Sequence, residues 1–358
     1  MKLERKQVSR KRKLVSMLVM ILLMVLFGIL GFFWFSLHRV QHVEIDKSKE
    51  ALGIHTSNDS KEETKEKEPA FQLYHDEIIN VALFGLDRRD EKDTGRADAT
   101  MILTVDFKHQ KIKLASLMRD MYINIDGYGK TKFNHAYSYG GAPLAIKTIN
   151  ENFGTDIQDY VSVDFFTLEK IIDAIGGIDI EVTDEEYPLM NKYMNEVASI
   201  HGEEYTPLTM GGFQHLNGKQ AVAYARIRKV GNGDFERTQR QRIVLTQMIE
   251  KISKMNKMEL SKLVYQLLPY VETSMDTKTI LDIGLNCLTK EIRNVEQDRF
   301  PRDGYWQAKT INHIWYMDFD LDSTKAQIQE FIYEPHQHEA ESVINNDLSN
   351  EAKEGTNV

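Results

Sequence analysis

Two aspartates lie where carboxylates could hold a divalent cation. Asp87 ends the apolar run 78–87, and Asp98 directly precedes the apolar run 99–105. About ten residues separate the two acids, too few for a helical crossover between parallel strands, so we expect an antiparallel pair with both acids at one sheet edge. Two carboxylates plus an oxygen-rich substrate suit Mg²⁺, whereas zinc would require His or Cys. Alternatively, both acids are ordinary turn residues at strand ends.

Arginines gather around the same segments of the sequence. They are Arg88, Arg89, Arg96 and Arg119 near the predicted strand ends, and Arg226, Arg228, Arg237, Arg240 and Arg242 further along the chain. A guanidinium group donates paired hydrogen bonds that match phosphate oxygens, whereas a lysine offers a point charge. This clustering indicates an anion-binding site, although for each arginine alone a solvated or salt-bridged role stays open.

The elements that must position these residues are strands interspersed with helices. Short runs rich in Val, Ile and Leu predict strands at 78–87, 99–105 and 111–117, and the alternating sequence IDIEV predicts a strand at 178–182. Apolar periodicity and capping residues predict helices at 143–154, 164–177 and 236–252. Residues 220–228 are ambiguous between helix and strand. The pattern predicts an α/β (α+β) fold, with a central mixed β-sheet flanked by helices in a single domain.

Several common chemistries are excluded. Cys287 is the only cysteine, so the chain has no intramolecular disulfide, cysteine zinc cluster or CxxC redox pair. The GK pair at 129–130 lacks the upstream glycine of a P-loop, because Asn124 occupies that position. There is no GxSxG nucleophile elbow.

An apolar segment at 14–37 predicts a membrane anchor. It contains no charged residue, and at about 1.5 Å per residue a helix of this length crosses a hydrocarbon core of about 30 Å. Its end, at 32–35, is entirely aromatic, which favours an uncleaved signal anchor over a cleavable signal peptide. The basic stretch 1–13 then predicts a cytoplasmic tail, with the rest of the chain outside the cell.

Charge-rich segments flank the predicted domain. Residues 46–70 contain few large apolar side chains and cannot bury enough surface to offset their ordering entropy. We therefore expect a disordered charged linker at 38–70, an extracellular catalytic domain at 71–335 and a disordered acidic tail at 336–358.

The charge distribution argues against nucleic acid as a partner. The whole chain carries −9, yet residues 1–13 contain seven basic residues and one acidic residue, so the remainder carries a net −15. Phosphate backbones require a cationic face, which such a domain does not offer in general. Local arginine clusters remain available for smaller anions.

Six ordered motifs behind the apolar segment resemble the LytR-CpsA-Psr family of Gram-positive bacteria. They are LFGLDRR, GRADAT, SLMRDMY, GYGKTKFNHAYSYGG, ARIRK and GDFERTQRQ. The motifs extend from Ile79 to Gln241, and the architecture matches over nearly the whole chain. The sequence departs from the family pattern at Met118, where Pro is usual, and at Glu236, where Gly is common. Both departures affect the backbone shape beside arginines.

The resemblance implies a Mg²⁺-dependent, extracytoplasmic phosphotransferase. Such enzymes move wall teichoic acid or capsular polysaccharide from a polyprenyl-pyrophosphate carrier to peptidoglycan, which makes membrane lipid a partner as well. By this resemblance Asp87 and Asp98 would hold Mg²⁺, and Asp234 would be a candidate base. The pyrophosphate would be bound by Arg89, Arg119, Arg226, Arg228 and Arg237, with Arg96 and Lys132 as weaker candidates. Arg119 would also act in catalysis.

Two other functions are considered. A module that binds polyprenyl phosphate or wall polymer without chemistry needs the arginines and an apolar pocket but no metal acids. A membrane-bound transcriptional regulator is disfavoured by the predicted outward topology and by the acidic domain.

Overall fold

The computed structural model describes residues 41–54, 77–87, 95–201 and 204–333. Seven strands form the central sheet: β1 (Gln41–His42), β2 (Ile78–Asp87), β3 (Arg96–Asp106), β4 (Lys111–Leu117), β7 (Asp159–Asp164), β10 (Glu272–Thr273) and β11 (Asn294–Phe300). Their order in space is β1-β10-β7-β2-β3-β4-β11, with both parallel and antiparallel pairs. Three two-stranded sheets lie outside this sheet: β5 (Tyr122–Ile125) with β6 (Gly129–Lys132), β8 (Ile178–Val182) with β9 (Gly212–Leu216), and β12 (Trp306–Ile311) with β13 (Ile314–Phe319).

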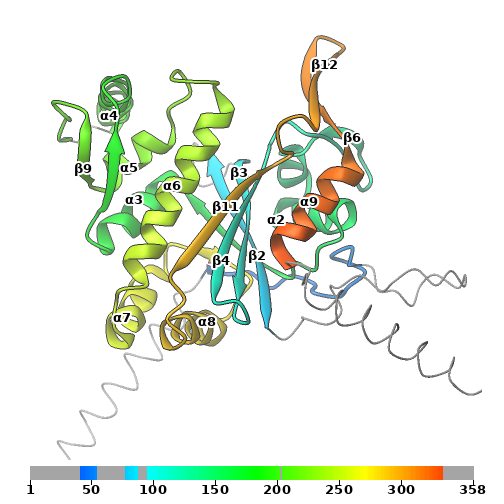
Figure 1. Ribbon diagram of the computed structural model, residues 1–358, viewed down its shortest axis with the longest axis horizontal. Helices are drawn as coiled ribbons and strands as arrows, with labels where there is room; N and C mark the ends of the chain where they lie inside the picture. The colour runs from blue at the N-terminus through cyan, green and yellow to red at the C-terminus, as the bar shows by residue number, and fades with distance from the viewer. Residues whose placement is uncertain (1–40, 55–76, 88–94, 202–203, 334–358) are drawn as a thin grey trace, which may run out of the picture.

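Helices cover both faces of the central sheet (Figure 1). They are α2 (His135–Phe153), α3 (Phe165–Ala174), α4 (Tyr187–His201), α5 (Gly218–Ala225), α6 (Asp234–Ile252), α7 (Lys257–Leu267), α8 (Thr277–Thr289) and α9 (Leu321–Tyr333). In Figure 1, α2 and α9 lie on one side of the sheet, and α3, α5 and α6 lie on the other. The predicted mixed sheet flanked by helices is confirmed.

A β-bulge sets the geometry at the end of the β2–β3 pair. The two strands are antiparallel, as their short connection predicts, and Asp87 faces Arg96 in the register. Gly85 faces Ala99 and Leu86 faces Ala97, so Asp98 is an extra residue without a Cα partner. A bulge bends the strand and turns the side chain of the extra residue in a new direction.

Side-chain alternation assigns the two faces of the sheet to different roles. Ala82, Phe84 and Leu86 of β2 belong to the core under α2 and α9, whereas Leu83, Gly85 and Asp87 lie outside that core and line a cavity on the opposite face, to whose lining Phe84 and Leu86 also contribute. On β3 the bulge interrupts the alternation, and the adjacent residues 98 and 99 both line the cavity.

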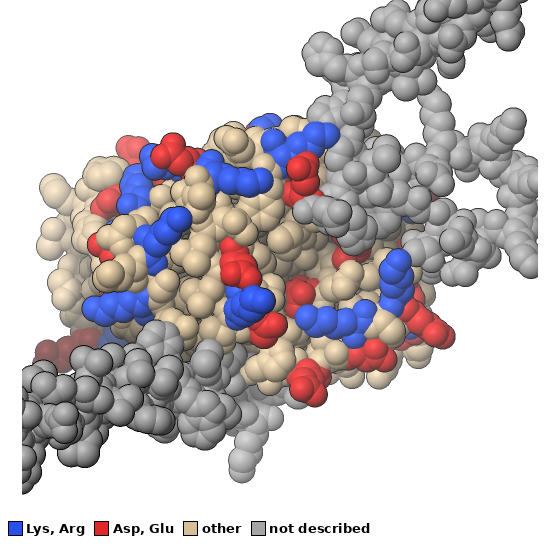
Figure 2. Space-filling view, turned by 90° about the horizontal axis from the view of Figure 1, so that it is seen from below, with Lys and Arg blue, Asp and Glu red and all other residues tan. Residues whose placement is uncertain are grey.

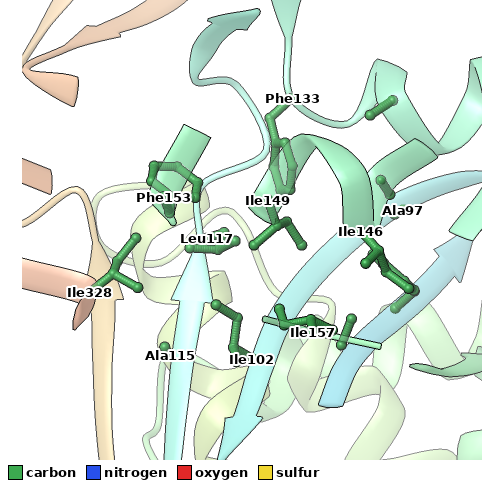
Figure 3. Packing of buried hydrophobic residues seen from close by; sticks show 14 of the residues in the cluster. Ala97, Ile102, Ala115, Leu117, Phe133, Ile146, Ile149, Phe153, Ile157 and Ile328 are labelled. Carbon is green, nitrogen blue, oxygen red and sulfur yellow. The ribbon is translucent and has the colours of Figure 1, made fainter. Parts of the chain in front are cut away.

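The main hydrophobic core fills the space between the sheet and α2. Ile102, Ala115 and Leu117 of the sheet belong to the same buried cluster as Ile149 and Phe153 of α2 (Figure 3). Ile102, Ile149 and Phe153 are completely buried. At about 25 cal/mol per Å² of apolar area, this packing stabilises the sheet that carries the site.

A second buried cluster lies on the other side. It contains Ile178, Ile180 and Val182 of β8 and Val244 and Met248 of α6. The sequence IDIEV alternates as predicted, with its apolar residues buried and its acids exposed. This cluster holds α6 in place beside the central sheet.

The predicted helices are confirmed, with one extension. The 143–154 helix is the second part of α2, which begins earlier, at His135, and is interrupted by the non-helical residues Gly140 and Gly141. Pro143 therefore lies in the first turn after this kink, and Gly154 ends the helix with a φ of 67°. The ambiguous 220–228 segment is mostly helical, as α5.

The prediction of a disordered linker over 38–70 is wrong for residues 41–54. β1 pairs with β10, and Leu52 is fully buried in the main core. The side-chain amide of Asn150 donates to the carbonyl of Leu52 at 2.8 Å. In the sequence, the few apolar residues of 41–54 lie among many charged ones, so the composition of this segment indicated a linker. The predicted membrane segment at 14–37 and acidic tail at 336–358 lie outside the described residues, within which no helix has the length and apolar character needed to cross a bilayer.

Charges of both signs are mixed on the surface. Figure 2 shows Lys and Arg side chains interspersed with Asp and Glu across the described part of the face seen from below. The described part of this face therefore shows no continuous cationic surface.

Candidate functional site

A cavity of about 490 Å³ lies between the central sheet and helices α3 and α6. Its apolar lining includes Leu83, Met101 and Leu103 from the sheet, Phe165, Leu168 and Ile171 from α3, and Val244, Leu245, Met248 and Ile252 from α6. A space of this size and character suits an extended apolar chain.

Charged residues line one end of the same cavity. Asp87 and Asp98 lie at the end of the β2–β3 pair, and Arg237 lies in the first turn of α6. Arg226 and Arg228 follow α5 and line the cavity as well. The apolar residues of β2, β3 and α6 lie further along each element, so the cavity has a charged end and an apolar body.

Asp98 accepts hydrogen bonds from three arginines. Its Oδ1 atom accepts from Nη1 of Arg119 at 2.7 Å. Its Oδ2 atom accepts from Nη2 of Arg228 at 3.0 Å and from Nη1 of Arg237 at 3.5 Å. Arg237 also donates to the main-chain carbonyl of Asp98 at 3.2 Å. These charge-assisted bonds fix three guanidinium groups that would otherwise repel one another.

Asp234 completes this cluster from the start of α6. Its carboxylate lies 2.7 Å from Nη2 of Arg237 and 3.3 Å from Nε of Arg119. Residues three apart share a helix face, which brings Asp234 and Arg237 together. We call Asp98, Asp234, Arg119, Arg228 and Arg237 the charged cluster.

Burial and neighbouring charges shift the pKa values within the charged cluster. Burial raises the pKa of Asp234 above its usual value, although Arg119 and Arg228 oppose this shift. For Arg119, burial favours the neutral form, but Asp234 and Asp98 outweigh it, and the pKa of Arg119 is raised. Arg119 is thus a permanent cation, whereas Asp234 is a stronger base than an exposed aspartate.

Asp120 and Lys132 extend the charged cluster on one side. Asp120 lies 3.5 Å from Nε of Arg119 and accepts a hydrogen bond from Nζ of Lys132 at 2.6 Å. The predicted weaker candidate Lys132 is therefore linked to Arg119 through Asp120. Sequence reasoning assigned no role to Asp120, although its position directly after Arg119 in SLMRDMY could have indicated one.

Other predicted residues lie apart from the charged cluster. Arg226 lines the cavity, with its guanidinium carbon 4.4 Å from the ring centre of Phe165 and 5.5 Å from that of Tyr193. Arg96 is exposed at the start of β3. The predicted pyrophosphate ligand Arg89 lies outside the described residues.

The two predicted metal ligands fit Mg²⁺ in their chemistry. Asp87 and Asp98 line the same end of the cavity, and both offer carboxylate oxygens, which this ion prefers. In the described part of the chain, no group of three or more His, Cys, Asp or Glu residues could hold a metal ion by itself. An ion at Asp87 and Asp98 would therefore take further ligands from phosphate oxygens and water.

Arg240 and Arg242, which the sequence grouped with the site, instead form contacts that hold the fold together. Arg240 is buried and binds Glu186 at 2.7 Å, and it also donates to the carbonyl of Ile227. Arg242 donates to Gln297 of β11, and burial, aided by Arg299, lowers its pKa to about 10. Arg242 lies five residues after Arg237 and so points to another face of the helix, whereas Arg240, three residues after Arg237, lies near the same face but is held by Glu186.

The arrangement can bind an anion that carries an apolar tail. Fixed guanidinium groups at the charged end can donate hydrogen bonds to phosphate oxygens, while the apolar body shields a hydrocarbon chain from water. The same guanidinium groups can stabilise charge that develops on a leaving phosphate.

The chain matches the model of the LytR_cpsA_psr family over residues 45–331. It is 30% identical to the polyisoprenyl-teichoic acid–peptidoglycan teichoic acid transferase TagU of Bacillus mycoides, over 77% of this chain and 80% of that one. It is also 30% identical to the regulatory protein MsrR of Staphylococcus aureus, over 73% of this chain and 76% of that one.

A solved structure shares the fold. The family protein YwtF (TagT) with bound octaprenyl pyrophosphate lipid aligns with a TM-score of 0.56 and 23% identity, over 81% of this chain and 99% of that one. The family model thus spans most of the chain, including the residues of the charged cluster and cavity. The protein described here belongs to the LytR-CpsA-Psr family.

Proposed function

We propose that this protein transfers an anionic glycopolymer, such as wall teichoic acid or capsular polysaccharide, from a polyprenyl-pyrophosphate carrier to peptidoglycan. One observation carries the proposal: a largely apolar cavity of about 490 Å³ ends at Asp98, which binds Arg228 and Arg237 of the cavity lining and Arg119 beside them. The name of TagU and the lipid bound to TagT support it, since both involve polyisoprenyl carriers.

In this mechanism the cavity binds the polyprenyl chain and the charged cluster binds the pyrophosphate. An acceptor hydroxyl oxygen attacks the phosphorus atom that carries the polymer, and a new P–O bond forms. The bond from this phosphorus to the bridging oxygen breaks, and polyprenyl phosphate leaves with the electron pair. Arg119, Arg228 and Arg237 stabilise the negative charge on the leaving phosphate, so positioning and electrostatics supply most of the rate.

Asp234 is the proposed acceptor of the hydroxyl proton. Its raised pKa makes it a better base than an exposed aspartate, and Arg119 and Arg237 hold its carboxylate in position. In a loose transition state the proton leaves late, which limits the contribution of this base.

A Mg²⁺ ion is proposed at Asp87 and Asp98. When bound there it would neutralise pyrophosphate charge and orient the phosphate oxygens. We further propose that 14–37 anchors the chain in the membrane, with 1–13 in the cytoplasm and the domain outside. This topology places the charged end within reach of both a membrane-embedded carrier and the wall.

The test uses the full-length protein, lipid-linked polymer and peptidoglycan fragments. Asp98→Ala and Arg119→Ala should each lower transfer by at least about 10²-fold, the scale of losing a preorganised charge. Matched surface variants, Asp282→Ala and Arg293→Ala, should retain activity, because both residues are exposed. Thermal unfolding of each variant checks that the domain is folded.

Two outcomes separate this proposal from its rivals. Full transfer by folded Asp98→Ala and Arg119→Ala proteins would remove the charged cluster from the mechanism. Binding of the lipid-linked polymer without turnover, and without any effect of a Mg²⁺ chelator, would favour a binding module instead.

A further inference from the structure

Two hairpins join directly beside Arg119. The β5–β6 hairpin follows Asp120 in the chain, and the β12–β13 hairpin docks onto it through a bridge between Met121 and Met317. The amide of Met317 also donates to the carbonyl of Asp120 at 2.9 Å. In Figure 1 the labels β6 and β12 lie at the same end of the molecule.

These hairpins and the start of α2 display aromatic rings to solvent. Tyr128 is 55% exposed, Tyr139 is 44% exposed and Trp315 is 39% exposed. Tyr128 and Tyr139 stack with ring centres 4.4 Å apart. Nζ of Lys132 lies 5.9 Å from the ring centre of Trp315. We call Tyr128, Tyr139 and Trp315 the aromatic belt.

Turn geometry and packing contacts position two of these rings. Tyr128 lies in a turn between Gly127 and Gly129, whose φ angles of 75° and 73° are readily adopted by glycine. Trp315 precedes Tyr316, which is buried and packs on Tyr122 with ring centres 4.8 Å apart. Exposed rings carried on hydrogen-bonded hairpins and on α2 form a recognition surface, and ring side chains lose little conformational entropy on binding.

A chain of contacts connects the aromatic belt to the charged cluster. Lys132 lies beside Trp315 and donates to Asp120, which in turn lies 3.5 Å from Arg119. The belt residues are absent from the lining of the apolar cavity. Arg119 therefore has the lipid cavity on its Asp98 side and the aromatic belt on its Asp120 side.

The positions of the cavity and the aromatic belt on two sides of Arg119 indicate which substrate contacts the belt. In phosphoryl transfer the attacking and leaving oxygens lie roughly in line on opposite sides of phosphorus. If the leaving lipid phosphate lies on the cavity side, the acceptor hydroxyl approaches from the belt side. We propose that the aromatic belt binds the glycan strand of the peptidoglycan acceptor, a proposal that rests on the transfer reaction above.

The chemistry of the belt suits a sugar chain better than a polyanion. The C–H face of a pyranose ring is apolar and slightly positive, which complements the negative face of an aromatic ring. The two lysines that contact aromatic rings here are already paired, Lys132 with Asp120 at 2.6 Å and Lys309 with Asp318 at 3.0 Å. The belt thus offers stacking surfaces, with these two charges neutralised.

The kinetic test varies donor and acceptor separately, using the full-length protein. Tyr128→Ala and Trp315→Ala should each raise KM for soluble, polymer-free glycan fragments about tenfold, because one stacking contact is lost. The value of kcat at saturating acceptor and KM for the lipid-linked donor should stay unchanged. Tyr128→Phe and Trp315→Phe should restore KM, since the ring is retained.

Phe213→Ala is the matched control, because Phe213 is 76% exposed on β9 and outside the belt. An unchanged acceptor KM in both belt variants would overturn the proposal, and so would a raised donor KM instead. Direct binding of the glycan fragments by calorimetry separates this proposal from the reaction itself. Loss of binding in the belt variants supports the belt even if no transfer occurs, and undiminished binding refutes it.

Discussion

Asp98 is the residue on which the charged cluster depends. It is an extra residue in a β-bulge, and its two carboxylate oxygens accept hydrogen bonds from Arg119, Arg228 and Arg237. These arginines come from three separate parts of the chain. A residue without a Cα partner in the ladder can turn toward all of them, which a regular strand residue could not do.

Asp234 predicts a specific pH dependence. If it is the base, transfer requires its ionised form, so the rate should fall as pH decreases through a pKa above the usual 3.8. Asp234→Asn should lower kcat/KM by at most about 10²–10⁴-fold and abolish this acidic limb. The measurement is kcat/KM as a function of pH for both proteins.

The same shift has a consequence for stability. Because the pKa of Asp234 is higher in the folded chain, its contribution to folding is present below the usual aspartate pKa and is lost as pH rises through the raised value.

In the kinetic experiment, an acidic limb of kcat/KM that persists unchanged in Asp234→Asn would assign the titration to another group.

At the scale of elements, helix termini bring the arginines into place. α5 begins with a capping box in which Asn217 accepts from the amide of Gln220 and Gln220 accepts from the amide of Asn217. The helix ends at Ala225, and Arg226 and Arg228 lie within the next three residues. The start of α6 carries Asp234 and Arg237, so the ends of two successive helices contribute to one site.

The capping box can be tested by stability. Asn217→Ala should lower the free energy of unfolding by about 1 kcal/mol, because the Gln220 amide loses its acceptor. Asn217→Asp should retain most of the stability, since its carboxylate can accept the same hydrogen bond. Denaturant unfolding measures both, and equal stability of Asn217→Ala and the unchanged protein would show that the cap is not needed.

At the scale of the whole molecule, one face of the central sheet packs against the main core and the other face lines the candidate binding site. The face under α2 and α9 carries the main buried core, whereas the opposite face leaves a cavity beneath α3 and α6. The N-terminal segment 41–54 belongs to the main core through Leu52 and to the sheet edge through β1. The folded domain therefore begins before residue 71.

Leu52 tests this boundary. Leu52→Ala should lower the free energy of unfolding by about 2–5 kcal/mol, because it opens a cavity in the main core. Met258→Ala is the control, since Met258 is 82% exposed on α7 and should have little effect. Denaturant unfolding compares the two. Similar, small losses in both variants would place Leu52 outside the cooperative core.

The sequence alone predicted the elements with strong local signals. Apolar runs predicted β2, β3 and β4, alternating apolar residues predicted β8, and capping residues such as Asp164 and Gly154 predicted helix ends. The short connection predicted the antiparallel β2–β3 pair. The ordered motifs predicted the family, together with most of the charged residues that the structure brings together.

Only the tertiary structure decided which charges act together. Arg237 and Arg240 are three residues apart on α6, yet Arg237 binds Asp98 and Arg240 binds Glu186. Composition cannot distinguish them, because the partners come from distant segments. The cavity likewise cannot be predicted from the sequence. Leu103 and Ile102 are both apolar strand residues, and only packing determines that Leu103 lines the cavity while Ile102 is buried in the main core. Local residue patterns specify backbone conformation, whereas sites depend on long-range contacts that the folded chain alone creates.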